Sequence, residues 1–329
     1  MKKAIVTGGA GFIGSHLVDA LLDEAYHVLV VDDFSSGTRE NLAEATARAG
    51  GRLSVIYGDV RSAEIVRPCL EFQPTEIFHL AAQMNVRRSV QDPQFDAEVN
   101  VVGTVQMLEI AKEAGVSTFF LASTGGAIYG EQERFPADEH HRICPESPYG
   151  VSKRAAELYL EYFARTSGFQ SISMRFANVY GPRQNPKGEA GVVAIFARRL
   201  IAGEPLTIYG DGEQTRDFVF VGDVVRAHLG VLGARREKSP FLVYNVGRGI
   251  ECSVNDVAKS MSATWKRIGP AEVKGRDVVI NYAPGLPGEQ RRSVIDAKRL
   301  SHDTGWQATI DLDAGLKATL ESFVESTPK

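Results

Sequence analysis

Short apolar runs alternate with helical patterns through the first half of the chain. The segments between the apolar runs have the periodicity of helices. After the run at residues 4–6, for example, Leu17, Val18, Leu21 and Leu22 recur at the spacing of one helical face. The runs that predict buried strands are residues 4–6, 28–31, 53–57, 76–80, 118–122 and 171–176. Strands that alternate with helices in this way predict an α/β fold built on a doubly wound parallel sheet of the Rossmann type.

The rhythm becomes irregular beyond Arg175. A stretch rich in turn formers covers residues 180–188. The pattern then predicts helices at 191–202, 222–232, 254–265 and 311–324, and strands at 206–209 and 242–246. We therefore predict two domains. The first covers residues 1–177 with returning segments near 218–247, and the second is a smaller α/β substrate-binding domain at 178–329, partly interleaved with the first.

Two long helical patterns stand out, at residues 93–114 and 149–167. Their apolar faces are larger than one sheet surface requires. This excess predicts that the chain forms a homodimer through these helices.

Composition narrows the class of protein. With 43% hydrophobic and 24% charged residues, the 329-residue chain is typical of soluble globular proteins. Its net charge of −4 argues against a nucleic-acid partner. The three cysteines, at positions 69, 144 and 252, are too far apart in sequence for a Cys-x-x-Cys pair, so they predict free thiols and no metal site. No apolar run reaches the roughly 20 residues that span a bilayer, and we expect a cytoplasmic protein.

The first predicted strand runs directly into a glycine-rich turn. Gly9, Gly11 and Gly14 have the spacing of a dinucleotide-binding turn, and Gly8, Gly11 and Gly14 repeat at every third residue. Such glycines let the backbone approach a pyrophosphate, which then meets the N-terminus of the following helix. Because strand, turn and helix follow in the right order, the sequence predicts a dinucleotide site.

Acidic residues follow the next two strands. Asp32 ends the 28–31 run, where a carboxylate is suited to the adenosine ribose hydroxyls and would repel a 2′-phosphate. This favours NAD over NADP, although Arg39 nearby leaves NADP open. Asp59 or Val60 is expected to touch the adenine. The small residues Ala81 and Ala82 let a cofactor lie against the backbone.

A tyrosine and a lysine lie one helical turn apart at Tyr149 and Lys153. Pro148 suits a first helical position, and good helix formers follow. A free phenol has a pKa of about 10 and is a poor base at neutral pH, whereas an ammonium one turn away lowers that pKa. On spacing alone the pair also fits an ordinary surface helix. The glycine turn and Thr124, at the end of a predicted strand, favour the chemical interpretation.

These motifs together resemble the extended short-chain dehydrogenase/reductase superfamily over essentially the whole chain. They include Thr7–Gly14, Tyr149-x-x-x-Lys153, residues 175–182 and residues 210–218. Within that superfamily the chain is most similar to the UDP-glucose (UDP-galactose) 4-epimerases. The resemblance implies that Tyr149 removes the sugar O4 proton, that Lys153 lowers the Tyr149 pKa and binds the nicotinamide ribose, and that Thr124 hydrogen-bonds O4.

The resemblance also implies the residues that bind cofactor and substrate. The NAD contacts are Gly8, Gly11, Phe12, Ile13, Gly14, Asp32, Asp33, Asp59, Val60, Leu80, Ala81, Ala82, Tyr149, Lys153 and Phe176. The UDP-sugar contacts are Thr124, Tyr149, Asn178, Val193, Arg216 and Ser293. A small residue at Ser293 leaves space for an N-acetyl group at C2 of the sugar.

Two departures from the family pattern leave alternatives open. The spacing from Thr124 to Tyr129 is one residue longer than in many relatives, so Ser123 or Thr124 faces the sugar, and we favour Thr124. Leu286 stands where relatives carry an arginine that grips the diphosphate. Either Arg291 or Arg292 substitutes for it, or the affinity for the diphosphate is weaker.

The reaction type follows from what the turn after Thr124 lacks. The related 4,6-dehydratases carry an Asp-Glu pair there and the decarboxylases tend to carry a Glu, whereas this chain has Gly125 and Gly126. What remains is oxidation and re-reduction at one carbon, hence epimerisation of a UDP-hexose. The alternatives are a related decarboxylase or 4-ketoreductase, or a non-catalytic NAD-binding regulator.

Overall fold

The computed structural model describes residues 1–186, 191–234, 239–270, 277–285 and 290–326. Its central feature is a seven-stranded, wholly parallel sheet in the order β10-β6-β5-β4-β1-β2-β3. The strands are β1 (Lys3–Thr7), β2 (His27–Asp32), β3 (Leu53–Tyr57), β4 (Glu76–His79), β5 (Thr118–Thr124), β6 (Gln170–Phe176) and β10 (Phe241–Val246). The order reverses at β1, as in doubly wound folds, which confirms the predicted fold class.

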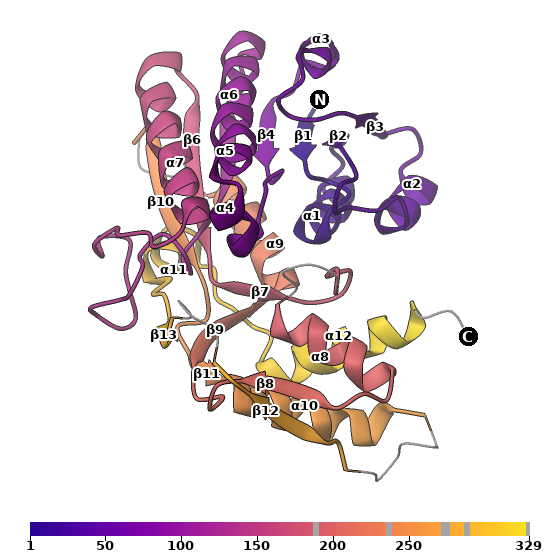
Figure 1. Cartoon of the computed structure of the whole chain (residues 1–329). Coiled ribbons are helices and arrows are strands. Elements are labelled where there is room, and N and C mark those ends of the chain that lie inside the picture. The colour runs from indigo at the N-terminus through magenta and orange to yellow at the C-terminus, as the bar shows by residue number, and fades with distance from the viewer. Residues whose placement is uncertain (187–190, 235–238, 271–276, 286–289, 327–329) are drawn as a thin grey trace.

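Helices cover both faces of the sheet (Figure 1). On one face lie α1 (Phe12–Asp23), α2 (Ala43–Arg48), α9 (Val221–Gly233) and α11 (Lys298–Thr304). On the other lie α3 (Val66–Phe72), α6 (Gly103–Ala114) and α7 (Pro148–Ser167). A hydrophobic core lies on each face of the sheet, because successive side chains of a strand point to opposite faces. In β1, Ala4 and Val6 belong to the core under α1 and α9, and Ile5 belongs to the core under α6 and α7.

The predicted helix at 93–114 is interrupted. Short helices α4 (Val86–Gln91) and α5 (Pro93–Ala97) precede a π-helical turn, η3 (Glu98–Val102), which leads into α6. The periodicity of apolar residues does not distinguish a π turn from an α turn. The two remaining short helical turns are η1 (Glu40–Leu42) and η2 (Ala63–Ile65).

A second layer lies beneath the lower end of the sheet in Figure 1. Helices α8 (Val192–Ile201), α10 (Val254–Ile268) and α12 (Leu312–Glu325) share a core with the parallel pair β8 (Leu206–Tyr209) and β12 (Ile280–Ala283). Between the two layers, β9 (Thr215–Phe220) pairs with β7 (Asn178–Tyr180), β11 (Glu251–Ser253) and β13 (Arg292–Ser293). The predicted helices and strands of the second half are present. The sequence did not predict β7, β9, β11 to β13 or α11, which are short or polar.

Candidate functional site

The glycine turn forms a cradle that a side chain would fill. Gly8 has φ +67°, and a Cβ there would lie 2.8 Å from the Ala81 nitrogen. A Cβ on Gly14 would lie 2.1 Å from the Gly8 carbonyl oxygen, so α1 can pack this close only with glycine. Phe12 and Ile13 form the first turn of α1, directly after Gly11. The turn therefore offers backbone N–H groups at a helix N-terminus, which suits a pyrophosphate.

Asp32 ends β2 beside this turn and is buried. Its carboxylate accepts the Ala10 N–H and the Phe34 N–H, both at 2.8 Å. Burial raises the Asp32 pKa, and the two backbone donors oppose that rise. Each carboxylate oxygen retains a lone pair for a ribose hydroxyl. Asp33 is exposed and accepts the backbone N–H and the hydroxyl of Ser35.

Arg39, which left NADP open, lies over the Phe34 ring with its guanidinium carbon 5.3 Å from the ring centroid. Phe34 and Tyr57 are stacked, with their ring planes 3° apart. These side chains line a hollow of about 290 Å³ beside the Asp32 loop. The side of the site next to the Asp32 loop is therefore lined by aromatic rings and a guanidinium.

The remaining cofactor candidates surround the same sheet edge. Asp59 is held by the Arg61 guanidinium, whose hydrogen bonds lower the Asp59 pKa. Val60 is buried, and its carbonyl accepts the Gln106 amide at 2.8 Å. Leu80 and Ala81 donate their N–H groups to the Thr7 carbonyl and hydroxyl, and Ala82 is half-buried behind them.

Helix α7 begins as the sequence predicts. Ser147 is the N-cap and its hydroxyl accepts the Gly150 N–H, with Pro148 as the first helical residue. The Tyr149 N–H donates to the Ser89 hydroxyl of α4 at 3.1 Å. A Cβ on Gly150 would lie 2.6 Å from the Ala127 oxygen, so the first turn of α7 packs directly on the turn after β5. Tyr149 therefore stands beside the Thr124 turn.

Lys153 is buried, and its Nζ donates to the Ala122 carbonyl of β5 at 2.9 Å. Burial lowers the Lys153 pKa to about 8, and the carboxylates of Asp96 and Glu157 oppose this change. The lysine is thus a buried cation one helical turn from Tyr149.

The hydroxyls of Ser123 and Thr124, the two candidates for the sugar contact, have different hydrogen-bond partners. The Ser123 hydroxyl donates to the buried Glu157 carboxylate. The Thr124 hydroxyl accepts the Ala127 N–H at 3.1 Å, and a Cβ on Gly126 would lie 3.9 Å from both this hydroxyl and the Asn178 amide oxygen. Thr124 therefore shares its surroundings with Asn178, and Ser123 is engaged elsewhere.

Glu157 is the centre of a buried network that sequence reasoning missed. Its carboxylate accepts Ser123, Ser173, Arg154 and two nitrogens of Arg175. Burial raises the pKa of Glu157, but the hydrogen bonds and charge of Arg175 outweigh it and leave that pKa below its usual value. The network fixes α7 to the carboxyl ends of β5 and β6. Buried charges of this kind are recognisable only after the fold is known.

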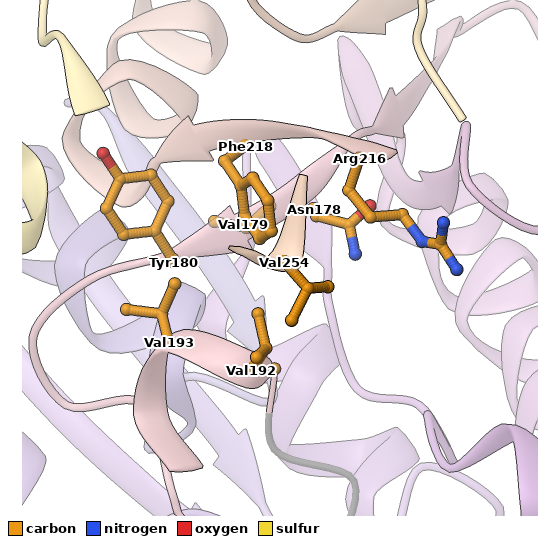
Figure 2. A pocket seen from close by; sticks show the side chains of 9 residues that line it. Asn178, Val179, Tyr180, Val192, Val193, Arg216, Phe218 and Val254 are labelled. Atoms are coloured by element: carbon orange, nitrogen blue, oxygen red, sulfur yellow. The ribbon is translucent and has the colours of Figure 1, made fainter. Parts of the chain in front are cut away.

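Asn178, Val193 and Arg216 line one cavity of about 170 Å³ (Figure 2). Asn178 comes from β7 and Arg216 from β9, while Gly191 to Val193 form the start of α8. Figure 2 shows Asn178 and Arg216 presenting nitrogens at one end of the cavity, with valines and aromatic rings around the rest. The cavity thus combines a cation and an amide with an apolar wall.

Ser293 is buried in β13 and is paired in register with Arg216, but it does not line this cavity. Two residues further on, Ile295 contacts the Thr124 turn, because a Cβ on Gly125 would lie 2.7 Å from the Ile295 Cδ1. Phe176 lies in register with Thr124, and its carbonyl accepts the Gly125 N–H at 2.7 Å.

The two arginines offered in place of Leu286 are paired elsewhere. Arg291 bonds Asp211, and Arg292 bonds Glu251 and lies 3.8 Å from the Phe135 ring centroid. Leu286 and the Pro-Gly-Glu segment at 287–289 lie outside the described residues. Within the part of the chain that the structure describes, Arg216 is the arginine that lines the cavity.

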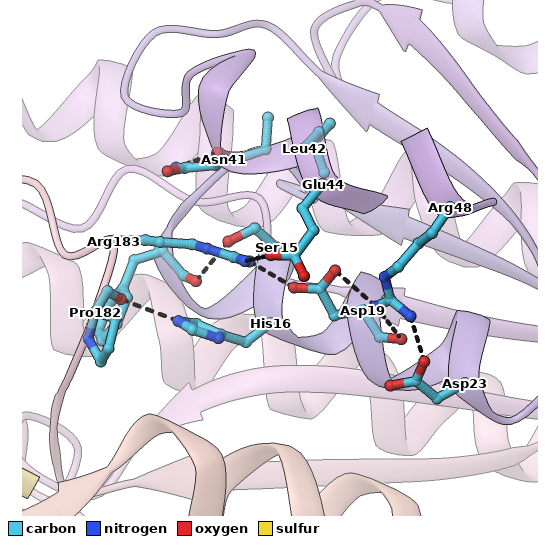
Figure 3. A network of polar contacts seen from close by, with 12 residues as sticks. Ser15, His16, Asp19, Asp23, Asn41, Leu42, Glu44, Arg48, Pro182 and Arg183 are labelled. Carbon is cyan, nitrogen blue, oxygen red and sulfur yellow. Dashed lines mark hydrogen bonds and ion pairs between the residues drawn. The ribbon is translucent and has the colours of Figure 1, made fainter. Parts of the chain in front are cut away.

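A second network missed by sequence reasoning joins α1 to the loop after β7 (Figure 3). The Arg183 guanidinium bonds the Asp19 carboxylate at 2.6 Å, and the His16 Nε2 lies 3.0 Å from the Pro182 carbonyl. Arg48 of α2 bonds the other oxygen of Asp19. Arg183 has φ +65°, an unfavourable conformation for a residue with a Cβ. The loop is therefore held against the cofactor side of the molecule.

None of the helices described is long and apolar enough to cross a membrane. No group of three or more His, Cys, Asp or Glu side chains in the described ranges could hold a metal ion.

Comparison with known proteins gives consistent matches. The family model described as GDP-mannose 4,6 dehydratase matches residues 5–319. A UDP-glucose 4-epimerase of Mycolicibacterium smegmatis is 41% identical over 321 residues, covering 98% of both chains. The crystal structure of a Thermotoga maritima UDP-glucose 4-epimerase with UDP-glucose is 41% identical, with TM-score 0.89 and 98% and 99% of the two chains covered. A Thermus thermophilus UDP-glucose 4-epimerase in complex with NAD is 39% identical, with TM-score 0.87 and 99% and 100% covered.

Proposed function

Because the chain belongs to the GDP-mannose 4,6 dehydratase family of extended short-chain dehydrogenases/reductases, we propose that it is an isomerase that inverts C4 of a UDP-hexose. The observation that carries this proposal is the turn after β5. Thr124 ends β5, the first turn of α7 packs on the turn that follows it through Gly150, and Gly125 and Gly126 in that turn bring no acid or base. One hydroxyl and one proton-transfer pair suit oxidation and re-reduction at a single carbon.

The chain offers a site that fits NAD. The Gly8–Gly14 cradle would take the pyrophosphate, and Asp32 and Asp33 would face the adenosine ribose. Asp59 and Val60 would border the adenine, and Leu80 to Ala82 with Phe176 would lie along the cofactor. When bound, NAD supplies the oxidation of C4 to a transient ketone and its reduction back to an alcohol.

The residues of α7 and β5 would manage the proton. Tyr149 accepts the proton of the sugar O4 hydroxyl and returns it when C4 is reduced again. The Lys153 ammonium favours the Tyr149 phenolate through its charge, which acts strongly because the group is buried. The Thr124 hydroxyl bonds O4 and orients it toward Tyr149.

Asn178 and Arg216 would hold the UDP diphosphate at the polar end of the cavity, with Val193 against the nucleoside. A guanidinium suits phosphate oxygens because it donates two parallel hydrogen bonds. We place Ser293 near C2 of the sugar, since its strand runs from Arg216 to the Gly125 turn. A small residue there would admit the N-acetylhexosamine pair as well as UDP-glucose and UDP-galactose.

Residues 1–177, with the returning segments near 218–247, would form the NAD-binding domain, and residues 178–329 the substrate-binding domain.

Several large apolar side chains on one side of α7, together with Val102 of η3, are exposed and support a homodimer. They are Val151, Leu158, Tyr159 and Tyr162. Light scattering of the wild type and Leu158→Glu tests this, and a monomeric wild type would contradict it. The cytoplasmic location stays a prediction.

The proposed activity is tested by incubating the purified protein with UDP-glucose, UDP-galactose and their N-acetyl counterparts, without added cofactor. NMR should show interconversion at C4, and mass spectrometry of the denatured supernatant should find NAD. Release of carbon dioxide from a UDP-hexuronate, or turnover that scales with added NADPH, would instead identify a decarboxylase or a ketoreductase. Bound NAD with no turnover of any nucleotide sugar would favour the non-catalytic regulator.

A further inference from the structure

Asp96 is a fully buried carboxylate in α5 with one satisfied and one unsatisfied oxygen. Its Oδ1 accepts the Gln83 amide at 2.7 Å and the Asn100 amide at 3.0 Å. Its Oδ2 has no hydrogen-bond partner among the described residues. An unsatisfied buried carboxylate oxygen is costly, so it calls for a functional explanation.

A network of amide hydrogen bonds surrounds Asp96. Asn100 lies in the π-helical turn η3 and donates to both the Gln83 carbonyl and Asp96 Oδ1. Gln83 in turn accepts the Asn85 N–H, and its own N–H donates to the Asn100 side chain. The two amides therefore fix the carboxylate through Oδ1 and leave Oδ2 as the oxygen available to another group.

The buried cation near Asp96 is Lys153. Helix α5 packs against α7, and the charge of the Asp96 carboxylate raises the pKa of Lys153 against the larger lowering by burial. Lys153 donates one described hydrogen bond, to Ala122, although an ammonium has three donors. A buried ammonium requires a counter-charge.

The other groups that face Lys153 are poorly suited to that task. Glu157, on the same helix, already accepts five hydrogen bonds, three of them from arginine nitrogens. His79 of β4 is fully buried between Thr7 and Thr104, and burial together with the Lys153 charge lowers its pKa to about 3. Tyr149, one turn earlier, is the group that Lys153 is proposed to act on.

We propose that Asp96 is the counter-ion of the Lys153 ammonium and therefore a positioning residue for the Tyr149–Lys153 proton-transfer pair. This inference rests on the proposed function, since it assigns Asp96 a part in that pair. Asp96 acts through Lys153: its negative charge keeps the lysine protonated at the pH of turnover, and the lysine in turn favours the Tyr149 phenolate.

The test is the pH profile of turnover in Asp96→Asn, which keeps the Oδ1 acceptor and removes the charge. Loss of a nearby anion lowers the pKa of both Lys153 and Tyr149, so both limbs of the profile should move to lower pH by about 1 unit. At the alkaline limb this is about a tenfold loss of kcat. The matched control is Glu109→Gln, which removes an exposed carboxylate of α6 and should leave the profile in place. A loss of kcat in Asp96→Asn with an unmoved profile would overturn the proposal.

Two measurements separate this inference from the proposed activity. In protein carrying 13C-labelled lysine, the Lys153 Cε resonance, identified by its absence in Lys153→Met, should titrate at lower pH in Asp96→Asn than in the wild type. An unchanged titration overturns the proposal, whether or not the protein turns over UDP-sugars. Asp96→Asn should also lower the Tm of the protein that retains Lys153. In the Lys153→Met variant, where the cation is absent, the same substitution should lower the Tm much less. Equal losses, or failure to fold in both backgrounds, would assign Asp96 a purely structural role.

Discussion

The Ser123 hydroxyl donates to the buried Glu157 carboxylate at 2.8 Å, which directs it toward α7, while its neighbour Thr124 shares its surroundings with Asn178. The two adjacent hydroxyls thus have different tasks. Thr124→Val should lower kcat roughly 10–100-fold, the value of one hydrogen bond to a developing charge. It should also lower the free energy of unfolding by about 1 kcal/mol, because the Ala127 N–H loses its acceptor. Ser123→Ala should lower the free energy of unfolding by about 1 kcal/mol and leave kcat intact. A loss of kcat in Ser123→Ala that is absent in Thr124→Val, measured by steady-state kinetics, would assign the sugar contact to Ser123.

Tyr149→Phe should cut turnover by roughly 10²–10⁴-fold, because it removes the proton acceptor and leaves the ring. NAD content, measured by mass spectrometry, should be nearly unaffected. The contact that holds this part of α7 to α4 uses the Tyr149 backbone N–H and Ser89, so it survives the substitution. A variant with more than about a tenth of wild-type turnover would remove Tyr149 from the proposed role.

Ser293→Tyr tests the proposed tolerance for an N-acetyl group. Ser293 is buried, so a tyrosine would project into the space beside the Gly125 turn or distort β13. Steric exclusion should lower kcat/KM for the N-acetylhexosamine pair and spare UDP-glucose and UDP-galactose. Equal losses for both pairs would show that Ser293 is not the gate. Ser293→Ala is the matched control and should accept both pairs.

Arg183 should act on substrate affinity from outside the cavity. Its ion pair with Asp19 holds the loop that leads from Asn178 toward α8. Arg183→Gln should raise the KM for the UDP-sugar roughly fivefold, the equivalent of about 1 kcal/mol for a partly buried pair, with kcat and NAD content little changed. Arg48→Gln breaks the other contacts of Asp19 and serves as the control. An equal rise in KM for both variants would attribute the effect to α1 and not to the loop.

Asp217 should make stability depend on pH. Burial raises its pKa to about 6, against the backbone N–H groups of Arg248 and Gly249, from an ordinary value of 3.8. The folded state therefore binds more protons between these values. The stability from protonated Asp217 is fully present below 3.8 and is lost as pH rises through 6. Between pH 5 and pH 7 the loss is about 1.3 kcal/mol.

Urea unfolding of the wild type and Asp217→Asn at pH 5 and pH 7 measures this contribution. The difference in unfolding free energy between the two proteins should change by about that amount in favour of the wild type at pH 5. Asp211→Asn, which alters an exposed carboxylate bonded to Arg291, should show no such change over this range. A pH-independent difference for Asp217→Asn would mean that Asp217 stays ionised in the folded protein.

The alternating strands and helices of the first half of the chain were predictable from the sequence. The strand runs and the glycine turn depend on local rules of periodicity and backbone sterics, so β1 to β6, α1 and α7 lie close to their predicted positions. Strand β9 was missed because it carries Thr215, Arg216 and Asp217, a polar stretch whose pairing with three short strands is non-local. The grouping of Thr124 with Asn178 could be expected, since both follow parallel strands whose carboxyl ends share one edge.

The supporting charges could not be predicted. Glu157, Asp96 and Asp19 look like ordinary solvated helix residues in the sequence, because carboxylates on helices are usually exposed. Only the packing of α7 on β5 and β6, and of the 182–185 loop on α1, shows that they bond arginines or remain unsatisfied. Long-range contacts of this kind depend on the whole topology, which a single sequence pattern does not encode.

Strand β10 completes the parallel sheet although it lies 65 residues after β6 in the chain, counting from Phe176 to Phe241. During synthesis on the ribosome, β6 therefore emerges with an unpaired edge and keeps it until residue 246 has left the exit tunnel. An open edge of this length invites pairing with other nascent chains. We expect fragments that stop before β10 to aggregate on expression, and nascent-chain pulling experiments to report sheet closure only after β10 is exposed.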